Sequence, residues 1–92
     1  MIDNPPRVLP EGCAIRLKCG SWTIPKVFPW LQRLGAVEDA VMYRVFNMGI
    51  GLVLIVAPYF ADSIVRLVSH KTRTPAWIIG EVVAGDRGVN WE

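Results

Sequence analysis

A polar turn with two glycines precedes an unbroken apolar run near the middle of the chain. Asn47, Gly49 and Gly51 stand at its start, and residues 49–57 carry no polar side chain. Glycine lets a backbone approach a ligand or a partner strand closely, but it also forms bulges where strands begin. We weigh these two interpretations evenly. The three residues are therefore candidates for lining a cleft.

The same turn does not have the pattern of a phosphate-binding loop. Such loops place their glycines before a helix, whose first N–H groups then face the phosphate. A strand rather than a helix is expected to follow Gly51, and no Walker lysine pattern occurs in the sequence. We therefore expect this chain to hold no nucleotide through a recognisable motif.

The remaining titratable residues form no convincing catalytic set. His70 is the only histidine and lies in a polar connection, where a solvated role is favoured over a general base. Glu38 and Asp39 suit the start of a helix, where the dipole favours acids. Glu81 lies inside an apolar stretch, where a carboxylate needs either a partner or an open face. We predict no catalytic, cofactor-binding or metal-ligating residue in this chain.

Composition predicts one small domain with more apolar surface than its own core can bury. The 92 residues carry a net charge of +2, and 52% of them are hydrophobic, against about 45–50% in typical soluble domains. A chain of this size builds one core. The apolar excess indicates surface that a partner copy or further polypeptide covers, so we predict a homo-oligomer that associates through apolar surface or strand edges.

Charge and hydropathy argue against two other classes of protein. The basic residues are scattered rather than gathered in a stripe, so no nucleic-acid partner is expected. The apolar run reaches only Pro58, well short of the about 20 residues that span a membrane. Cys13 and Cys19 form no CxxC pair and follow no signal peptide, which predicts reduced thiols in a cytoplasmic protein.

Periodicity predicts an α/β (α+β) fold in which a mixed sheet of about three strands carries helices on one face. Residues 1–12 contain three prolines and are expected to be an irregular arm, and residues 13–92 a single partial domain. Alternation predicts strands, with the second central, and apolar stripes predict helices. The predicted strands are 13–18, 49–57 and 76–84, and the predicted helices are 25–35, 38–44 and 59–69.

Several blocks of the sequence, taken in order, resemble the C-terminal part of aminoimidazole ribonucleotide synthetase, also called phosphoribosylformylglycinamidine cyclo-ligase (AIR synthase). The segment Tyr-Arg-x-Phe-Asn-x-Gly-Ile-Gly is the most specific of them, and together the blocks span nearly the whole chain. They are residues 6–12, 21–22, 28–32, 42–44, 46–51 and 77–82.

The resemblance implies an ATP-dependent ring closure in purine biosynthesis, which converts formylglycinamidine ribonucleotide to aminoimidazole ribonucleotide. It also implies that ATP and magnesium bind mainly to an N-terminal domain that these residues do not represent. We therefore expect a C-terminal fragment or split-gene product that is not catalytic alone, with Asn47, Gly49 and Gly51 near an interdomain cleft. The alternative is a non-catalytic oligomerising or regulatory module that keeps the fold.

Overall fold

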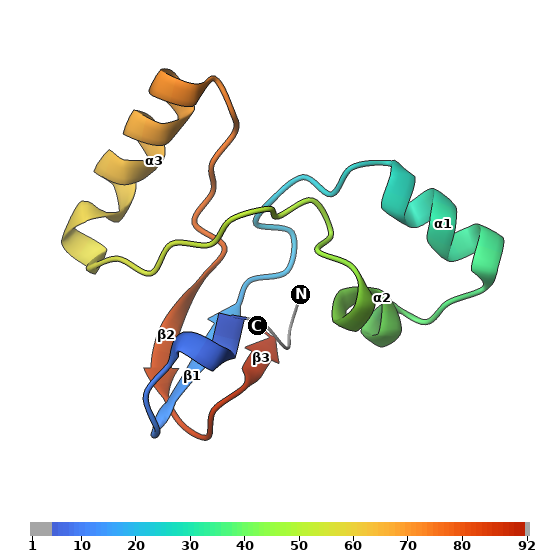
Figure 1. The fold of residues 1–92 in the computed structure, drawn as a ribbon, viewed down its shortest axis with the longest axis horizontal. Helices are drawn as coiled ribbons and strands as arrows, with labels where there is room; N and C mark the ends of the chain where they lie inside the picture. Colours follow the sequence, from blue (N-terminus) through green and yellow to red (C-terminus); the bar gives the residue numbers. More distant parts are fainter. Residues whose placement is uncertain (1–4, 92) are drawn as a thin grey trace.

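The computed structural model describes residues 5–91 as a small sheet with helices spread around it. Figure 1 shows α3 on one side of the molecule and α1 with α2 on the other, with the sheet below them. The elements follow in the order η1 (Pro5–Val8), β1 (Cys13–Leu17), α1 (Val27–Gly35), α2 (Asp39–Val45), α3 (Pro58–Thr72), β2 (Gly80–Ala84) and β3 (Val89–Trp91).

The sheet is mixed, with strand order β2-β1-β3. β1 runs antiparallel to β2, with Cys13 opposite Ala84 and Leu17 opposite Gly80. It runs parallel to β3, with Ile15 opposite Val89. The predicted α+β class with a mixed three-stranded sheet is confirmed, and β1 rather than a later strand occupies its centre.

The predicted central strand at residues 49–57 is wrong. This stretch is neither a strand nor a helix, and every residue from 51 to 60 is exposed. An apolar run of this kind predicts a strand buried on both faces, but a strand also needs neighbours that accept and donate its backbone hydrogen bonds. Among residues 5–91 no strand pairs with it, so the segment stays extended without a ladder.

The last part of the sheet also differs from its prediction. The final strand begins at Gly80 rather than at residue 76, and Trp77 and Ile78 are exposed before it. β3 follows a turn containing Gly85 and Gly88, in a tail for which no strand is predicted. Three residues are too few to show an alternating pattern, so only the pairing with β1 reveals this strand.

A compact core joins β1 to α2 and to three connecting segments. It draws Leu9 from the segment after η1, so part of the proline-rich stretch packs against the sheet. α3 contributes no member of this cluster. Met42 is the largest fully buried side chain, with 1% of its surface exposed. The buried cluster consists of Leu9, Ile15, Leu17, Trp22, Met42 and Met48.

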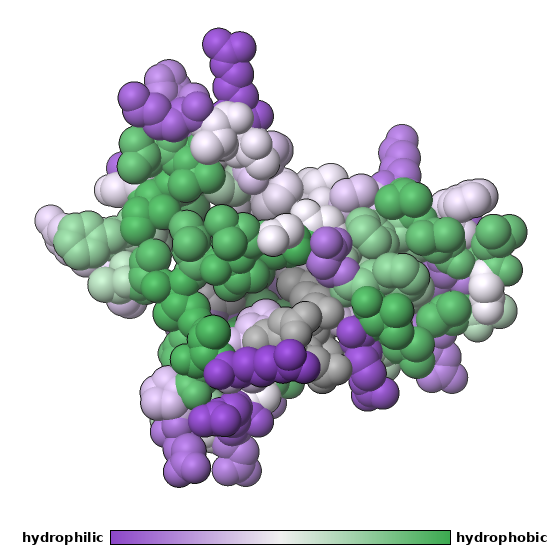
Figure 2. All heavy atoms as spheres, in the orientation of Figure 1, coloured by the Kyte–Doolittle hydropathy of each residue, from purple (hydrophilic) through white to green (hydrophobic). Residues whose placement is uncertain are grey.

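Helix α1 forms as its apolar stripe predicts, but the stripe is not covered. Trp30 is half exposed and Leu34 is 71% exposed. The helix buries no residue fully, although Phe28 packs against Phe46 with ring centroids 5.9 Å apart. It ends at Gly35, and the left-handed position after it belongs to Ala36. The stripe therefore adds to the apolar surface visible in Figure 2.

Gly80 is a point of close approach between β1 and β2. A Cβ built on it would lie 2.2 Å from the backbone oxygen of Arg16. We expect Gly80→Ala to lower the free energy of unfolding by about 1–3 kcal/mol, since the edge strand β2 must shift away from β1. Urea unfolding monitored by circular dichroism measures this change, and a midpoint equal to that of the unsubstituted chain would contradict it.

Candidate functional site

The residues after α2 form a tight turn that is fixed by its own hydrogen bonds. The Gly49 N–H donates to Asn47 Oδ1 at 2.8 Å, and the Ile50 N–H donates to the Asn47 carbonyl at 3.0 Å. Met48 and Gly49 have φ angles of 53° and 95°, as the mirror-image type I′ turn requires at its two central positions. The turn thus has a defined shape, and it replaces the bulge that would have started a strand at residue 49.

The two glycines of this turn differ in what surrounds them. At Gly49 a Cβ would lie 2.4 Å from Pro25 Cδ, so both the space and the positive φ require glycine there. At Gly51 a Cβ would meet nothing within 4 Å, and its φ lies outside the strained range. The structure of residues 5–91 therefore explains Gly49 and leaves Gly51 open to an approaching ligand or chain.

Trp22 holds the turn through a buried hydrogen bond. Its indole Nε1–H donates to the Met48 carbonyl at 3.1 Å in a buried setting, and Met48 itself is buried. Tyr43 meets Trp22 edge-on at 6.4 Å between ring centroids and meets Trp91 at 4.8 Å. The sequence gives no sign of this role, because a tryptophan in a short loop does not identify its distant hydrogen-bond partner.

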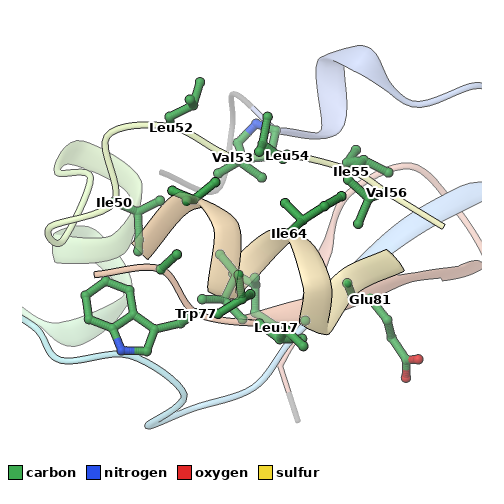
Figure 3. Close-up of a pocket in the computed structure, with 18 of the residues that line it drawn as sticks. Leu17, Ile50, Leu52, Val53, Leu54, Ile55, Val56, Ile64, Trp77 and Glu81 are labelled. Atoms are coloured by element: carbon green, nitrogen blue, oxygen red, sulfur yellow. The ribbon is translucent and has the colours of Figure 1, made fainter. Parts of the chain in front are cut away.

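A large apolar groove opens beside the turn (Figure 3). Its volume is about 950 Å³, and its walls include residues 50–56, one side of α3, the stretch from Thr74 to Val82, and Ile15 and Leu17 of β1. Gly49 and Gly51 are among its lining residues. The candidate residues are thus divided: the two glycines border the groove, while Asn47 shapes the turn at its end. Their place in an interdomain cleft remains a prediction.

Glu81 is explained by a cross-strand partner. Its carboxylate forms an ion pair with the Arg16 guanidinium, directly opposite it in the β1–β2 register. Figure 3 shows the Glu81 carboxylate pointing away from the groove. Both side chains are about half exposed, so the pair contributes only about 0.2–1 kcal/mol. Glu81 has the partner that its apolar surroundings require.

The protonation of Tyr43 should make the stability of the chain depend on pH in the alkaline range. Burial raises the pKa of its phenol above 10.0, and the negative charges of Cys19 and Asp39 act in the same direction. As the pH rises, the unfolded chain therefore loses the Tyr43 proton before the folded chain does. The contribution of the protonated Tyr43 to the free energy of unfolding is complete below pH 10.0 and is lost as the pH rises above that value. Urea unfolding at rising pH should show a decline that is shallower in Tyr43→Phe, and identical slopes would contradict it.

Among residues 5–91, no three His, Cys, Asp or Glu side chains gather closely enough to hold a metal ion. No helix in this part of the chain has the length and apolar character needed to cross a membrane.

A glycine turn of defined shape thus borders an apolar groove, and much of the lining of that groove is exposed. Comparison with known proteins then identifies the family of the chain. The C-terminal domain of AIR synthase related proteins matches residues 1–91, and the chain belongs to this family.

Curated relatives of the chain include proteins named phosphoribosylformylglycinamidine cyclo-ligase. The protein of Trichlorobacter lovleyi is 48% identical over 82 residues, which are 89% of this chain and 23% of the relative. That of Pseudothermotoga lettingae is 40% identical over 89 residues, 97% of this chain and 26% of the relative. A chloroplastic or mitochondrial form from Vigna unguiculata is 45% identical over 85 residues, 91% of this chain and 21% of the relative. The chain thus spans about a quarter of the length of these relatives.

Proposed function

We propose that this chain supplies the C-terminal contribution to the ring closure performed by phosphoribosylformylglycinamidine cyclo-ligase. The continuous family match over residues 1–91 carries the proposal. In this role the chain provides one wall of the substrate cleft, and a separate ATP-binding domain provides the nucleotide site, with ATP and magnesium as its cofactors. The chain alone does not turn over substrate.

The turn at residues 47–51 is the part of the chain that we assign to the cleft. Asn47 has its side-chain oxygen occupied by the Gly49 N–H, and the amide nitrogen of the same side chain is a donor. Gly51 leaves room for a group to approach the backbone. Polar oxygens of a ribonucleotide substrate are suitable acceptors for such donors. The turn would then position substrate without taking part in bond making.

Complementation tests this function directly. The chain is mixed with ATP, magnesium and formylglycinamidine ribonucleotide, with or without the part of the Trichlorobacter lovleyi relative that lies outside the matched region. We expect ADP and aminoimidazole ribonucleotide only when both polypeptides are present. Robust turnover by the chain alone would overturn its assignment as non-catalytic, and no turnover by the mixture would count against the cleft role.

Substitution at Gly51 provides the matched variant for that assay. Gly51→Val fills the open position, so turnover by the mixture should fall about tenfold or more, while the urea midpoint of the chain stays close to that of the unsubstituted protein. A variant with full turnover would show that nothing approaches Gly51.

Cytoplasmic location is part of the same proposal, and the free thiols of Cys13 and Cys19 suit a reducing compartment.

The uncovered apolar surface favours a second candidate, a non-catalytic module that oligomerises or regulates an intact cyclo-ligase. Residues 51–60 are all exposed although most of them are large and apolar, and such a patch drives association. Failure of complementation, together with binding of the chain to the intact Trichlorobacter lovleyi enzyme by analytical ultracentrifugation, would favour this candidate.

A further inference from the structure

The peptide that joins Met48 to Gly49 is held at both of its polar ends. Its carbonyl accepts a hydrogen bond from the Trp22 indole at 3.1 Å, and its N–H donates to Asn47 Oδ1 at 2.8 Å. One planar unit thus connects a buried tryptophan to an exposed asparagine. A rotation of this peptide would break both hydrogen bonds, so the orientation of the Asn47 amide depends on the indole.

Trp22 is itself anchored to the sheet. Its side chain is buried, and it meets the ring of Tyr43 edge-on. The residue before it, Ser21, donates from its N–H and its Oγ to the Lys18 carbonyl, at 3.3 and 2.7 Å. The Lys18 N–H donates to the Ile79 carbonyl at 2.8 Å, one residue beyond the β1–β2 ladder. The indole is therefore held in place by the end of the central strand.

The turn needs this support because Met48 has a left-handed backbone conformation. Its φ is 53°, a region that is unfavourable for residues with a Cβ. The hydrogen bond from the indole to the Met48 carbonyl opposes a return of this residue to negative φ. Such a return would move the Gly49 N–H away from Asn47 Oδ1, and the asparagine amide would then be free to rotate.

Fixing the oxygen of the Asn47 amide also fixes its nitrogen. The amide group is planar, so when Oδ1 accepts from the Gly49 N–H the Nδ2 group is directed away from that N–H. Asn47 is exposed, and its Nδ2 group donates to no residue among residues 5–91. A donor that is ordered before binding loses less entropy when it meets an acceptor. Asn47 Nδ2 is thus a pre-oriented donor.

We propose that Trp22 is a positioning residue for the substrate, which acts through the Met48 carbonyl to orient Asn47 Nδ2 towards an oxygen of the ribonucleotide. The inference rests on the proposed function, which places this turn in the cleft. Trp22 is buried beside the turn and does not touch the substrate. The oriented donor binds the ground state and the transition state alike, so its loss raises KM and leaves kcat unchanged.

Steady-state kinetics of the complemented mixture test this role. Trp22→Phe should raise the KM for formylglycinamidine ribonucleotide about tenfold, the effect of about one lost hydrogen bond, and leave kcat per folded chain unchanged. Asn47→Ala should raise KM by a similar factor. The double variant should have the KM of Asn47→Ala alone, because the tryptophan acts through the asparagine and the two effects are not additive.

Leu9→Ala is the control for lost stability. It removes packing from the same core and leaves the hydrogen bonds of the turn in place, so KM and kcat per folded chain should not change. An unchanged KM in Trp22→Phe, an equal rise of KM in Leu9→Ala, or additive effects of Trp22→Phe and Asn47→Ala on KM would each overturn the inference.

Nuclear magnetic resonance of the chain alone tests the structural step separately. Nitrogen-15 relaxation should show an ordered Asn47 side-chain amide in the unsubstituted chain and a mobile one in Trp22→Phe. An amide that is equally ordered in both would overturn the inference, whether or not the mixture is active. No turnover by the unsubstituted mixture would overturn the proposed function and the substrate role of Trp22 together, whereas turnover with an unchanged KM in Trp22→Phe would overturn this inference alone.

Discussion

Replacing Gly49 with alanine should lower the free energy of unfolding by about 3–5 kcal/mol, which combines backbone strain at a positive φ with forced overpacking. The new Cβ would stand 2.4 Å from Pro25 Cδ, at a φ of 95° that alanine rarely adopts. The proline ring is rigid, so the turn itself must move. A domain of this size is stabilised by only about 5–15 kcal/mol. The variant should therefore be partly unfolded in mild urea.

Gly51→Ala is the matched control for that experiment. It makes the same chemical change two residues later, where a Cβ has open space. Its urea midpoint should equal or slightly exceed that of the unsubstituted chain, because alanine reduces the freedom of the unfolded state. Equal losses at both positions would show that the turn is not built as described.

Replacing Trp22 with alanine should cost about 3–5 kcal/mol, as expected for a large buried aromatic side chain. The change leaves a void beside Tyr43 and removes the indole donor to the Met48 carbonyl. Because that carbonyl is buried with its turn, it loses a partner that water cannot easily replace. Thermal unfolding followed by circular dichroism should show a lower midpoint for Trp22→Ala.

Trp22→Phe separates the hydrogen bond from the packing. Phenylalanine keeps an aromatic ring near Tyr43 but has no donor, so we expect a loss of about 1–3 kcal/mol. The same variant should loosen the turn, which faster hydrogen exchange at Gly49 and Ile50 would reveal. Unchanged exchange at both amides, together with unchanged stability, would show that the indole does not hold the turn.

The helices were largely predictable because their signals are local. Apolar residues three and four apart mark α1 and α3, Pro58 begins α3, and the acids near Glu38 mark the start of α2. β1 follows from its alternating residues. What local signals cannot give is the partner of an apolar face, so the exposed stripe of α1 looks the same in sequence as a buried one.

The error at residues 49–57 has the same origin. Val, Ile and Leu in succession indicate a preference for extended backbone, and the backbone there is extended. A strand, however, is a property of two segments, and the sequence of one segment does not name the other. The opposite error occurs at Val89–Trp91, where three residues without a distinctive pattern form a strand because β1 lies beside them.

For the candidate site, residue types were predictable and contacts were not. Two glycines beside Asn47 indicated an unusual backbone conformation. The structure shows a tight turn in which the Gly49 N–H donates a hydrogen bond to Asn47 Oδ1. Nothing in sequence linked Pro25 or Trp22 to this turn, since both lie before two intervening helices. Glu81 was recognised as needing a partner, but its pairing with Arg16 depends on the register of β1 and β2.

The position of β1 also governs the order of folding. Both of its neighbours come from residues 80–91, after all three helices. Within this chain, Ile15 and Leu17 therefore gain their strand partners only through long-range pairing. Long-range closure of this kind is slow and leaves intermediates with exposed apolar surface. Formation of the sheet, rather than of the helices, should therefore limit the rate at which residues 5–91 fold.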